Sequence, residues 1–221
     1  MGGDRLRSRL HLRRVGASGG LAWLCALAVC AWVVGGVGWA EERDEWQQPN
    51  RVMADLSLAP GMCVADVGCG EGYFTFRLAE AVGEGGRVSA VDIDADAIGS
   101  VRRQAEKGHL ANVQAMVSEP TDTKLQSGSV DVALLCDVLH EAGPEQRAPL
   151  VRDIARALKP GGFLFIVDYR KVHEVPFDPY EQLIPREDLV RLGEEAGLTL
   201  DAEFHYLKYQ VFLRLRKPAQ P

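Results

Sequence analysis

From residue 60 onward, short apolar runs alternate with stretches whose apolar residues recur at helical spacing. The apolar runs predict five strands, at 63–67, 88–92, 113–117, 130–136 and 163–168. The amphipathic stretches between them predict helices at 73–82, 95–107 and 144–158. Strands that are apolar on both faces and separated by helices indicate a parallel sheet covered on each side, with right-handed crossovers.

The C-terminal part of the chain has a different pattern. A helix is predicted at 185–196, followed by two β-type runs at 198–204 and 206–216 with no helix between them. Two strands joined in this way form an antiparallel hairpin, which we expect at the edge of the sheet. Residues 41–56 predict a leading helix above the ligand-binding edge. The fold class is therefore α/β: a doubly wound, Rossmann-like sheet of seven strands, mostly parallel, with helices on both faces.

The first 40 residues are unlike the rest of the chain. They contain five arginines and one acidic residue, and the run 21–34 has fourteen residues without a polar side chain. A basic start, an apolar run of this length and the small residues of Gly38-Trp39-Ala40 are typical of a secretory signal peptide. The uncharged stretch 21–40 has 20 residues, which at about 1.5 Å per residue can also span a bilayer of about 30 Å.

We therefore expect residues 1–40 to be a signal peptide or an N-terminal membrane anchor, and residues 41–221 to form one domain. Both alternatives place the domain outside the cytoplasmic membrane, because arginines that flank an apolar segment stay inside. An anchor would also associate the protein with the membrane through residues 21–40. A mis-assigned start codon or an internal helix is the remaining alternative, and it leaves the domain in the cytoplasm.

Charge and cysteine content narrow the class of function. Outside the first 40 residues the chain carries 20 basic and 30 acidic residues, and the whole chain has a net charge of −6. An acidic surface of this kind argues against a general nucleic-acid binder. The domain has three cysteines, Cys63, Cys69 and Cys136, an odd number without metal-ligand spacing. Neither a disulfide framework nor a metal site is therefore expected.

The most informative stretch is the glycine-rich turn after the first predicted strand, Asp66-Val-Gly68-Cys-Gly70-Glu-Gly72. Glycine permits a positive φ angle and lets the backbone approach a ligand closely. Ligands of open α/β sheets bind beyond the carboxyl ends of the strands. At the end of the second strand, 20 residues after Gly72, Asp92 can accept hydrogen bonds from both hydroxyls of a ribose. These features together predict a nucleoside ligand.

The spacing of the turn distinguishes three kinds of nucleoside ligand. A dinucleotide loop has the pattern Gly-x-Gly-x-x-Gly, whose third position here is Tyr73, so a nicotinamide-dependent oxidoreductase fits poorly. A triphosphate loop needs Lys followed by Ser or Thr, which the turn lacks. The acid before the glycines, Asp66, repels phosphate and suits a cation such as an amino group or a sulfonium.

In these motifs the sequence resembles the class I S-adenosylmethionine-dependent methyltransferases, over roughly residues 46–216, as an exported or membrane-anchored variant. The matching motifs are the glycine turn, Asp92, the segment from Ser129 to Glu141, and Leu158-Lys-Pro160-Gly-Gly162. One such motif is weak evidence for a family, whereas four motifs in the expected order are specific evidence. The fourth-strand and tail regions look most like small-molecule methyltransferases of quinone biosynthesis. The resemblance implies S-adenosylmethionine as cofactor and a small or lipophilic methyl acceptor.

The resemblance also implies a role for each residue of the glycine turn. Asp66, Gly68 and Gly70 would line the methionine part of the cofactor, and Cys69 and Gly72 belong to the same binding turn. The alternative for Asp66 is a simple cap of the turn. Cys69 would be a small filler without a base beside it, and therefore a poor nucleophile.

The remaining cofactor contacts are expected at the ends of the next three strands. Asp92 would bind the ribose, and Ile93 would flank the adenine. An acid after the third strand would meet the adenine amino group; Glu119 and Asp122 both fit the spacing. Asp137, at the end of the fourth strand, would lie beside the reacting methyl group.

Catalysis by such an enzyme chiefly requires alignment, because the methyl group of this cofactor is already activated by its positive sulfur. A general base is needed when the acceptor carries a proton of high pKa. His140 is the best candidate, together with Asp137, because it follows the fourth strand near Asp137 and Glu141. The alternative is a structural histidine bonded to the following turn.

Several other polar and aromatic positions have two interpretations. Tyr169 either lines the acceptor pocket or covers the sheet edge. Trp46 with Gln47 either covers the cofactor or anchors the first helix. Asp131 is expected to be structural, and Asp94 to be the N-cap of the next helix.

The competing function is a catalytically silent S-adenosylmethionine-binding or ligand-sensing module on the same fold. An exported domain has no evident supply of the cofactor, which favours this alternative. The intact glycine turn and Asp92 favour the enzyme, with a small-molecule or lipophilic substrate and no nucleic-acid partner.

Overall fold

The computed structural model describes residues 43–173 and 180–219, and the predicted N-terminal segment 1–40 therefore lies outside the described residues. From Asp44 to Pro221 the chain forms one structural unit. Among the residues that the structure describes, no helix is both long enough and apolar enough to cross a membrane.

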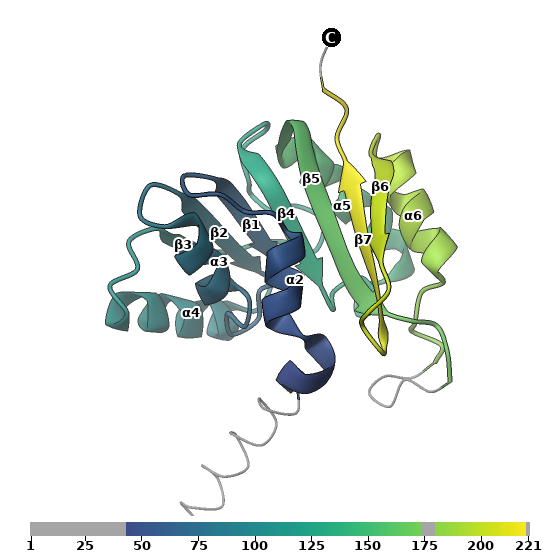
Figure 1. Ribbon diagram of the computed structural model, residues 1–221, viewed down its shortest axis with the longest axis horizontal. Helices are drawn as coiled ribbons and strands as arrows, with labels where there is room; N and C mark the ends of the chain where they lie inside the picture. Colours follow the sequence, from purple (N-terminus) through teal and green to yellow (C-terminus); the bar gives the residue numbers. More distant parts are fainter. Residues whose placement is uncertain (1–42, 174–179, 220–221) are drawn as a thin grey trace, which may run out of the picture. The chain divides into compact units, whose positions relative to one another are not determined.

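The unit is built on one sheet, which has the predicted seven strands. They are β1 (Cys63–Val67), β2 (Arg87–Asp92), β3 (Val113–Val117), β4 (Val130–Cys136), β5 (Leu158–Tyr169), β6 (Thr199–Phe204) and β7 (Gln210–Arg216). Their order in the sheet is β3-β2-β1-β4-β5-β7-β6 (Figure 1). The first five strands pair in parallel, and β7 is antiparallel to both β5 and β6. The predicted fold class and the C-terminal hairpin at the edge are therefore confirmed.

The order of the strands determines where a ligand can bind. The chain proceeds outward from β1 through β2 to β3, and then returns to the other side of β1 with β4. The loops after β1 and β4 therefore leave the sheet in different directions, and ligands of doubly wound folds bind at such a point. These two loops are the glycine turn and the segment that carries Asp137 and His140.

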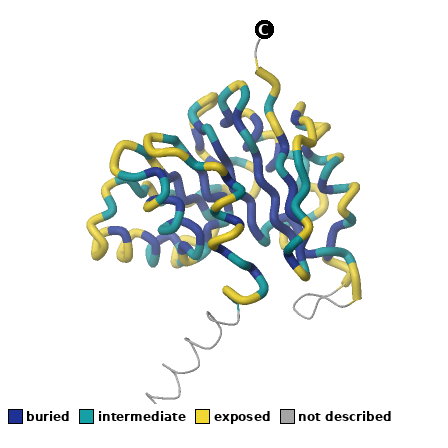
Figure 2. The backbone as a smooth tube through the Cα atoms, viewed as in Figure 1, coloured by how far each residue is buried: buried dark blue, intermediate teal, exposed yellow. Residues whose placement is uncertain are grey.

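Helices cover both faces of the sheet. They are α2 (Pro49–Asp55), α3 (Thr75–Val82), α4 (Ala95–Lys107), α5 (Pro144–Ala157) and α6 (Arg186–Glu195). α2 and α3 share an apolar cluster with Val64, whereas α5 and α6 share one with Ala65. Neighbouring residues of β1 belong to different clusters because successive side chains of a strand point to opposite faces. In Figure 2 the buried residues accordingly follow the central strands.

The leading segment differs from the single helix predicted at 41–56. Residues 43–47 are helical, α2 follows, and Gln48 between them has a φ of 47°. Pro49 explains the break, because a residue before proline is disfavoured in the right-handed helical region. Proline is well suited to begin α2, since the first residue of a helix needs no N–H group.

β5 also differs from the prediction, because it begins at Leu158 rather than Phe163. The segment Pro160-Gly161-Gly162, which lies before the predicted strand, belongs to the strand. Gly161 has a φ of 81°, and its N–H donates to the carbonyl oxygen of Lys217 at 3.0 Å. Glycine thus allows an irregular start of the strand that a pattern of apolar residues does not reveal.

Candidate active site

The glycine turn is held close to the sheet by its own backbone. The N–H of Gly68 donates to the carbonyl oxygen of Val91 at 2.8 Å, and the N–H of Gly72 donates to that of Cys69 at 2.9 Å. Gly68 has a φ of 69°, and a Cβ atom there would lie 2.3 Å from Cγ2 of Val138. Gly70 has a φ of 51°, but a Cβ atom there would meet nothing within 4 Å. The turn is therefore packed at Gly68 and open at Gly70.

Asp92 holds the open part of the turn. Its Oδ2 atom accepts a hydrogen bond from the N–H of Gly70 at 2.8 Å, and its Oδ1 atom accepts one from the N–H of Asp94 at 2.9 Å. Asp92, which is predicted to bind the ribose, and the glycine turn, which is predicted to bind the methionine part of the cofactor, are thus in direct contact. Ile93 follows with 62% of its surface exposed, which is unusual for a large apolar side chain and suits a residue that flanks a ligand ring.

Asp66 lies below the turn, at the carboxyl end of β1. Its side chain is buried, with 3% exposed, and its Oδ2 atom accepts a hydrogen bond from the hydroxyl of Thr75 at 2.6 Å. Thr75 is the first residue of α3, so this bond joins the end of the strand to the start of the helix. The carboxylate is fixed in position directly before the glycines.

The turn lies in a negative electrostatic environment. The pKa of the Cys69 thiol is raised well above its usual value, first by burial and then by the negative charges of Asp66 and Asp92. Cys69 therefore stays a protonated thiol, in agreement with its expected lack of nucleophilic character. The same field favours a ligand with a positive charge and disfavours phosphate, so these residues fit a sulfonium nucleoside.

Glu119 and Asp122 lie together on the connection between β3 and β4. Both accept hydrogen bonds from the ammonium group of Lys124 at 2.7 Å, and the pKa of Asp122 is lowered mainly by that contact. The N–H of Ser118 donates to the carbonyl oxygen of Asp92 at 2.8 Å, which places the start of this connection beside the ribose acid. The side chain of Glu119 is the more exposed of the two, at 68% against 46%.

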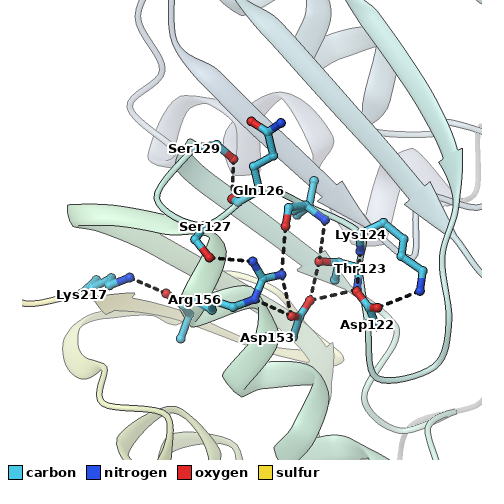
Figure 3. A network of polar contacts seen from close by, with 11 residues as sticks. Asp122, Thr123, Lys124, Gln126, Ser127, Ser129, Asp153, Arg156 and Lys217 are labelled. Carbon is cyan, nitrogen blue, oxygen red and sulfur yellow. Dashed lines mark hydrogen bonds and ion pairs between the residues drawn. The ribbon is translucent and has the colours of Figure 1, made fainter.

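The connection has no helix of its own and is fastened to α5 by polar contacts (Figure 3). Asp153 of α5 accepts hydrogen bonds from the N–H of Thr123 at 2.9 Å and from its hydroxyl at 2.6 Å. Arg156 contacts Asp153, the hydroxyl of Ser127 and the carbonyl oxygen of Leu125. These bonds replace the packing that a crossover helix would provide, and they hold the two acids beside β2.

At the end of β4, Asp137 has a φ of 58°, a left-handed conformation that is uncommon outside glycine. Its N–H donates to the carbonyl oxygen of Val167 at 2.8 Å. Its Oδ1 atom accepts a hydrogen bond from the side-chain amide of Gln210, whose Oε1 atom accepts one from Nε2 of Gln47 at 2.9 Å. Both glutamine side chains are completely buried.

His140 is paired with Asp168, at the end of β5. Its Nδ1 atom lies 2.7 Å from Oδ1 of Asp168, and the two side chains are 2% and 1% exposed. Asp168 also accepts hydrogen bonds from the N–H groups of Leu139 at 2.9 Å and of Tyr169 at 2.8 Å. An ionised carboxylate only accepts, so the proton lies on Nδ1 of His140, and Nε2 is the nitrogen that can take up another. The side-chain contact of His140 therefore reaches Asp168 of β5.

Aromatic rings continue from this pair to the N-terminal segment. The ring centre of Tyr169 lies 5.1 Å from that of His140 and 6.0 Å from that of Trp46. The centre of Trp46 also lies 6.4 Å from that of Tyr209. These contacts anchor the segment around Trp46 to the ends of β5 and β7, as one of its two interpretations predicts.

Two acids lie away from this group, as expected. Asp131 is near the start of β4, where it accepts hydrogen bonds from the N–H of Cys63 and from Lys159, each at 2.8 Å. Asp94 is the N-cap of α4 and accepts hydrogen bonds from the N–H groups of Asp96 and Ala97. Both residues stabilise the fold at these positions.

Sequence analysis did not identify the partners of the two catalytic candidates. Asp168 carried a usable signal, because it is an acid at the end of an apolar strand, as Asp92 is. Gln210 carried no such signal in the sequence, since a polar residue in a hairpin at the edge of a sheet is ordinarily exposed. Its burial depends on Gln47, which is 163 residues away in the sequence.

The fold and these residues define a class: the chain contains a class I S-adenosylmethionine-dependent methyltransferase domain, as its motifs predicted. Residues 64–162 match the family model described as "Methyltransferase domain". The structure is similar to the crystal structure of an S-adenosylmethionine-dependent methyltransferase from Aquifex aeolicus, with a TM-score of 0.73 and 26% identity. The similarity covers 79% of this chain and 92% of that one.

Two curated relatives show how far the similarity extends. The chain is 33% identical over 156 residues to the arsenite methyltransferase of Halobacterium salinarum, which covers 65% of this chain and 39% of the relative. It is 30% identical over 152 residues to the ubiquinone/menaquinone biosynthesis C-methyltransferase of Shewanella woodyi, which covers 67% of this chain and 58% of the relative. The chain thus spans less than two thirds of the length of both relatives.

Proposed function

We propose that the domain transfers the methyl group of S-adenosylmethionine to a small lipophilic acceptor that loses a proton when it is methylated. The observation that carries the proposal is the acid-lined glycine turn, which is open at Gly70 and has the carboxylates of Asp66 and Asp92 beside it. A bound cation with a nucleoside attached fits this combination of charge and space.

In this proposal the cofactor is held by the residues predicted from the sequence. Asp66 and the turn Gly68-Cys69-Gly70-Glu71-Gly72 hold its methionine part. Asp92 binds the ribose, Ile93 flanks the adenine, and Glu119 meets the adenine amino group. When bound, the cofactor supplies a methyl group that its positive sulfur has activated.

The residues at the ends of β4 and β5 provide the proton chemistry. His140 accepts the proton of the acceptor's hydroxyl group on Nε2, as the new bond to the methyl carbon forms. Asp168 holds the other ring nitrogen and stabilises the positive charge that the imidazole ring gains. The proton then passes from His140 to water, so the base is regenerated for the next turnover.

The acceptor class rests on the residues of this chain, because the names of the two curated relatives give different acceptors. The rings of Trp46, Tyr169 and Tyr209 lie on the His140 side of the site and suit an apolar, ring-containing molecule. A hydroxylated ring, such as that of a quinol, offers both the apolar surface and the proton. The quinone-biosynthesis relative supports this class of acceptor.

The proposal for the whole chain includes its N-terminal segment. Residues 1–40 export the domain formed by residues 41–221, or anchor it to the membrane through residues 21–40. The uncharged 20-residue stretch behind five arginines supports this assignment. N-terminal sequencing of the protein from membrane and soluble fractions tests it, and recovery of Met1 or Gly2 from a soluble cytoplasmic pool would contradict it.

Methyl transfer is tested with S-adenosylmethionine labelled in its methyl group and with extracted lipids and quinols as acceptors. The wild-type chain should bind the cofactor in calorimetry and label a lipophilic product. His140→Gln should bind with unchanged affinity and transfer no label, whereas the control His109→Gln, at the exposed end of α4, should transfer normally. Binding without any transfer would favour the silent module, and no binding at millimolar cofactor would reject both functions.

A further inference from the structure

A line of buried polar side chains connects the N-terminal segment to Asp137. Gln47 donates to Gln210 at 2.9 Å, and Gln210 donates to the carboxylate of Asp137. Gln47 precedes α2, Gln210 begins β7 and Asp137 follows β4, so the line joins three distant parts of the sequence. Both glutamines have 0% of their surface exposed. We call these three residues the amide line.

The chemistry of the three side chains fixes the direction of the amide line. A carboxylate only accepts hydrogen bonds, so Gln210 must turn its NH2 group toward Asp137. Its carbonyl oxygen then faces Gln47, and Gln47 must present its own NH2 group. An amide is needed at position 210, because neither a carboxylate nor an apolar side chain could accept on one side and donate on the other, and a donor is needed at position 47.

Burial makes this arrangement expensive unless every bond is formed. A buried amide that loses its partner costs roughly 1–3 kcal/mol, and apolar side chains of similar size could fill the same space without that risk. The N-terminal segment is also fastened without the amide line. Gln48 donates to the carbonyl oxygen of Tyr206 at 3.2 Å, and Trp46 packs on Tyr169 and Tyr209. Attachment of the segment alone therefore does not account for two buried amides that end on a carboxylate.

The backbone at Asp137 indicates what the amide line does. The residue keeps a φ of 58°, which costs roughly 1–2 kcal/mol outside glycine. The side chain is held on both oxygens: Oδ1 accepts from the amide of Gln210, and Oδ2 lies 3.6 Å from the thiol sulfur of Cys136. A charged side chain on a strained loop needs a fixed partner to stay in one orientation. Gln210 is held at two places: its side-chain carbonyl oxygen accepts from Gln47 at 2.9 Å, and its backbone carbonyl oxygen accepts from Nε of Arg170 at 2.9 Å.

We propose that Gln210 and Gln47 are positioning residues that aim the carboxylate of Asp137 at the sulfur-bearing part of the cofactor. The inference rests on the proposed function, since it gives Asp137 the place beside the methyl group. The segment around Gln47 is then part of the active centre.

The electrostatic consequence can be measured without turnover. S-adenosylmethionine carries a positive sulfur, whereas its demethylated product S-adenosylhomocysteine is neutral there and otherwise similar. A carboxylate aimed at the sulfur favours the first ligand only. The amide line should therefore set the ratio of the two affinities, and a merely structural role would change both affinities alike.

The experiment compares the two affinities by calorimetry in the full chain and in five variants. Asp137→Asn should reduce the preference for S-adenosylmethionine by about tenfold, as expected for the loss of a charged contact. Gln210→Leu and Gln47→Leu should reduce it several-fold, with little change in the affinity for S-adenosylhomocysteine. Gln210→Met has a similar shape without the donor and adds no charge, so it tests the same point if the leucine variant does not fold.

Gln48→Ala is the matched control, because it loosens the same segment without touching the amide line. It should leave the ratio of affinities unchanged. Two results would overturn the inference and leave the proposed function standing. One is an equal loss of both affinities in the Gln210 and Gln47 variants. The other is a ratio of affinities that stays unchanged in these variants while Asp137→Asn lowers it. If the wild-type chain binds neither ligand, the proposed function fails, and the inference fails with it.

Discussion

Gly68 and Gly70 both have positive φ angles, but a side chain at each position would meet different surroundings. At Gly68 an added Cβ atom would lie 2.3 Å from Val138, within the packed base of the turn. At Gly70 it would project into open space. A glycine in open space has no packing reason to be there, so the space above Gly70 is where a ligand would press against the backbone.

Alanine substitutions should therefore separate stability from binding. Gly68→Ala is expected to lower the free energy of unfolding by about 3 kcal/mol, because backbone strain adds to the overlap with Val138. Gly70→Ala is expected to lower it by only about 1–2 kcal/mol, from strain alone, yet to abolish measurable binding of S-adenosylmethionine. Thermal unfolding and calorimetry on the two variants provide the measurements. Undiminished binding in Gly70→Ala would place the cofactor elsewhere.

Asp92 provides a second test at the same scale. Its carboxylate holds the N–H of Gly70 and, in our proposal, the ribose hydroxyls, which both forms of the cofactor share. Asp92→Ala should therefore weaken the binding of S-adenosylmethionine and of S-adenosylhomocysteine by the same factor, about tenfold or more. Asp96→Ala removes a nearby acid from the first turn of α4 and serves as the control. A selective loss of one ligand would contradict the role of Asp92 in binding the ribose.

At the scale of single residues, the sequence predicted acids that end strands but not the partners that fix them. Asp66, Asp92 and Asp137 could be identified because a charged residue at the end of an apolar run has a place at the carboxyl edge of the sheet. The pairing of Asp137 with Gln210 depends on contacts between residues far apart in the chain, which periodicity does not contain.

At the scale of elements, the strands were predicted more accurately than the segments that join them. β1, β3 and β4 have the predicted bounds, because turn residues interrupt the apolar runs at both ends. The leading helix was predicted wrongly at Gln48, which has a left-handed conformation and precedes Pro49, where the right-handed helical region is disfavoured. The apolar periodicity continues through such a break, so a prediction based on periodicity does not detect the break.

The attachment of α6 to β6 gives a prediction about pH. Arg186 donates to Oε2 of Glu203 at 2.9 Å and 2.6 Å, and this contact holds the pKa of Glu203 below its usual value. The pair therefore stabilises the folded state above the ordinary pKa of glutamate, and that contribution is lost as the pH falls through the lowered value. Solvent screening keeps it small, since the side chain of Arg186 is 42% exposed.

Glu203→Gln should lower the free energy of unfolding by about 0.5 kcal/mol at pH 7, as urea unfolding would measure. The difference from the wild type should shrink on acidification and vanish once the pH has fallen below the lowered pKa of Glu203. Glu194→Gln removes the same charge from the exposed face of α6 and controls for net charge. A difference that persists at low pH would mean that packing, rather than the ion pair, is lost.

At the scale of the molecule, alternation of strands and helices was sufficient to predict a doubly wound sheet, because parallel strands need covered faces and crossover connections. The place of the site follows from the reversal between β1 and β4. The line of contacts by which the N-terminal segment completes that site did not follow, since it depends on Gln47 meeting a strand near the other end of the chain.

This dependence predicts where the folded domain begins. A chain that starts at residue 42 keeps Asp44, which accepts hydrogen bonds from Tyr73 and Arg77, and it also keeps Trp46 and Gln47. A chain that starts at Pro49 retains every strand of the sheet but lacks Gln47, so the buried side-chain carbonyl oxygen of Gln210 loses its hydrogen-bond donor. Such a loss costs roughly 1–3 kcal/mol, and the exposed surface around Trp46 adds to it.

The shorter chain should accordingly unfold about 5 °C or more below the longer one, because roughly 1 kcal/mol corresponds to about 2–4 °C for a domain of this size. Differential scanning calorimetry on the two chains provides the measurement. A third chain that starts at residue 42 and carries Gln47→Leu separates the two contributions, since it keeps the packing of Trp46 and loses only the amide. Equal melting temperatures for all three would mean that the folded domain begins at α2 and that the amide line adds nothing to its stability.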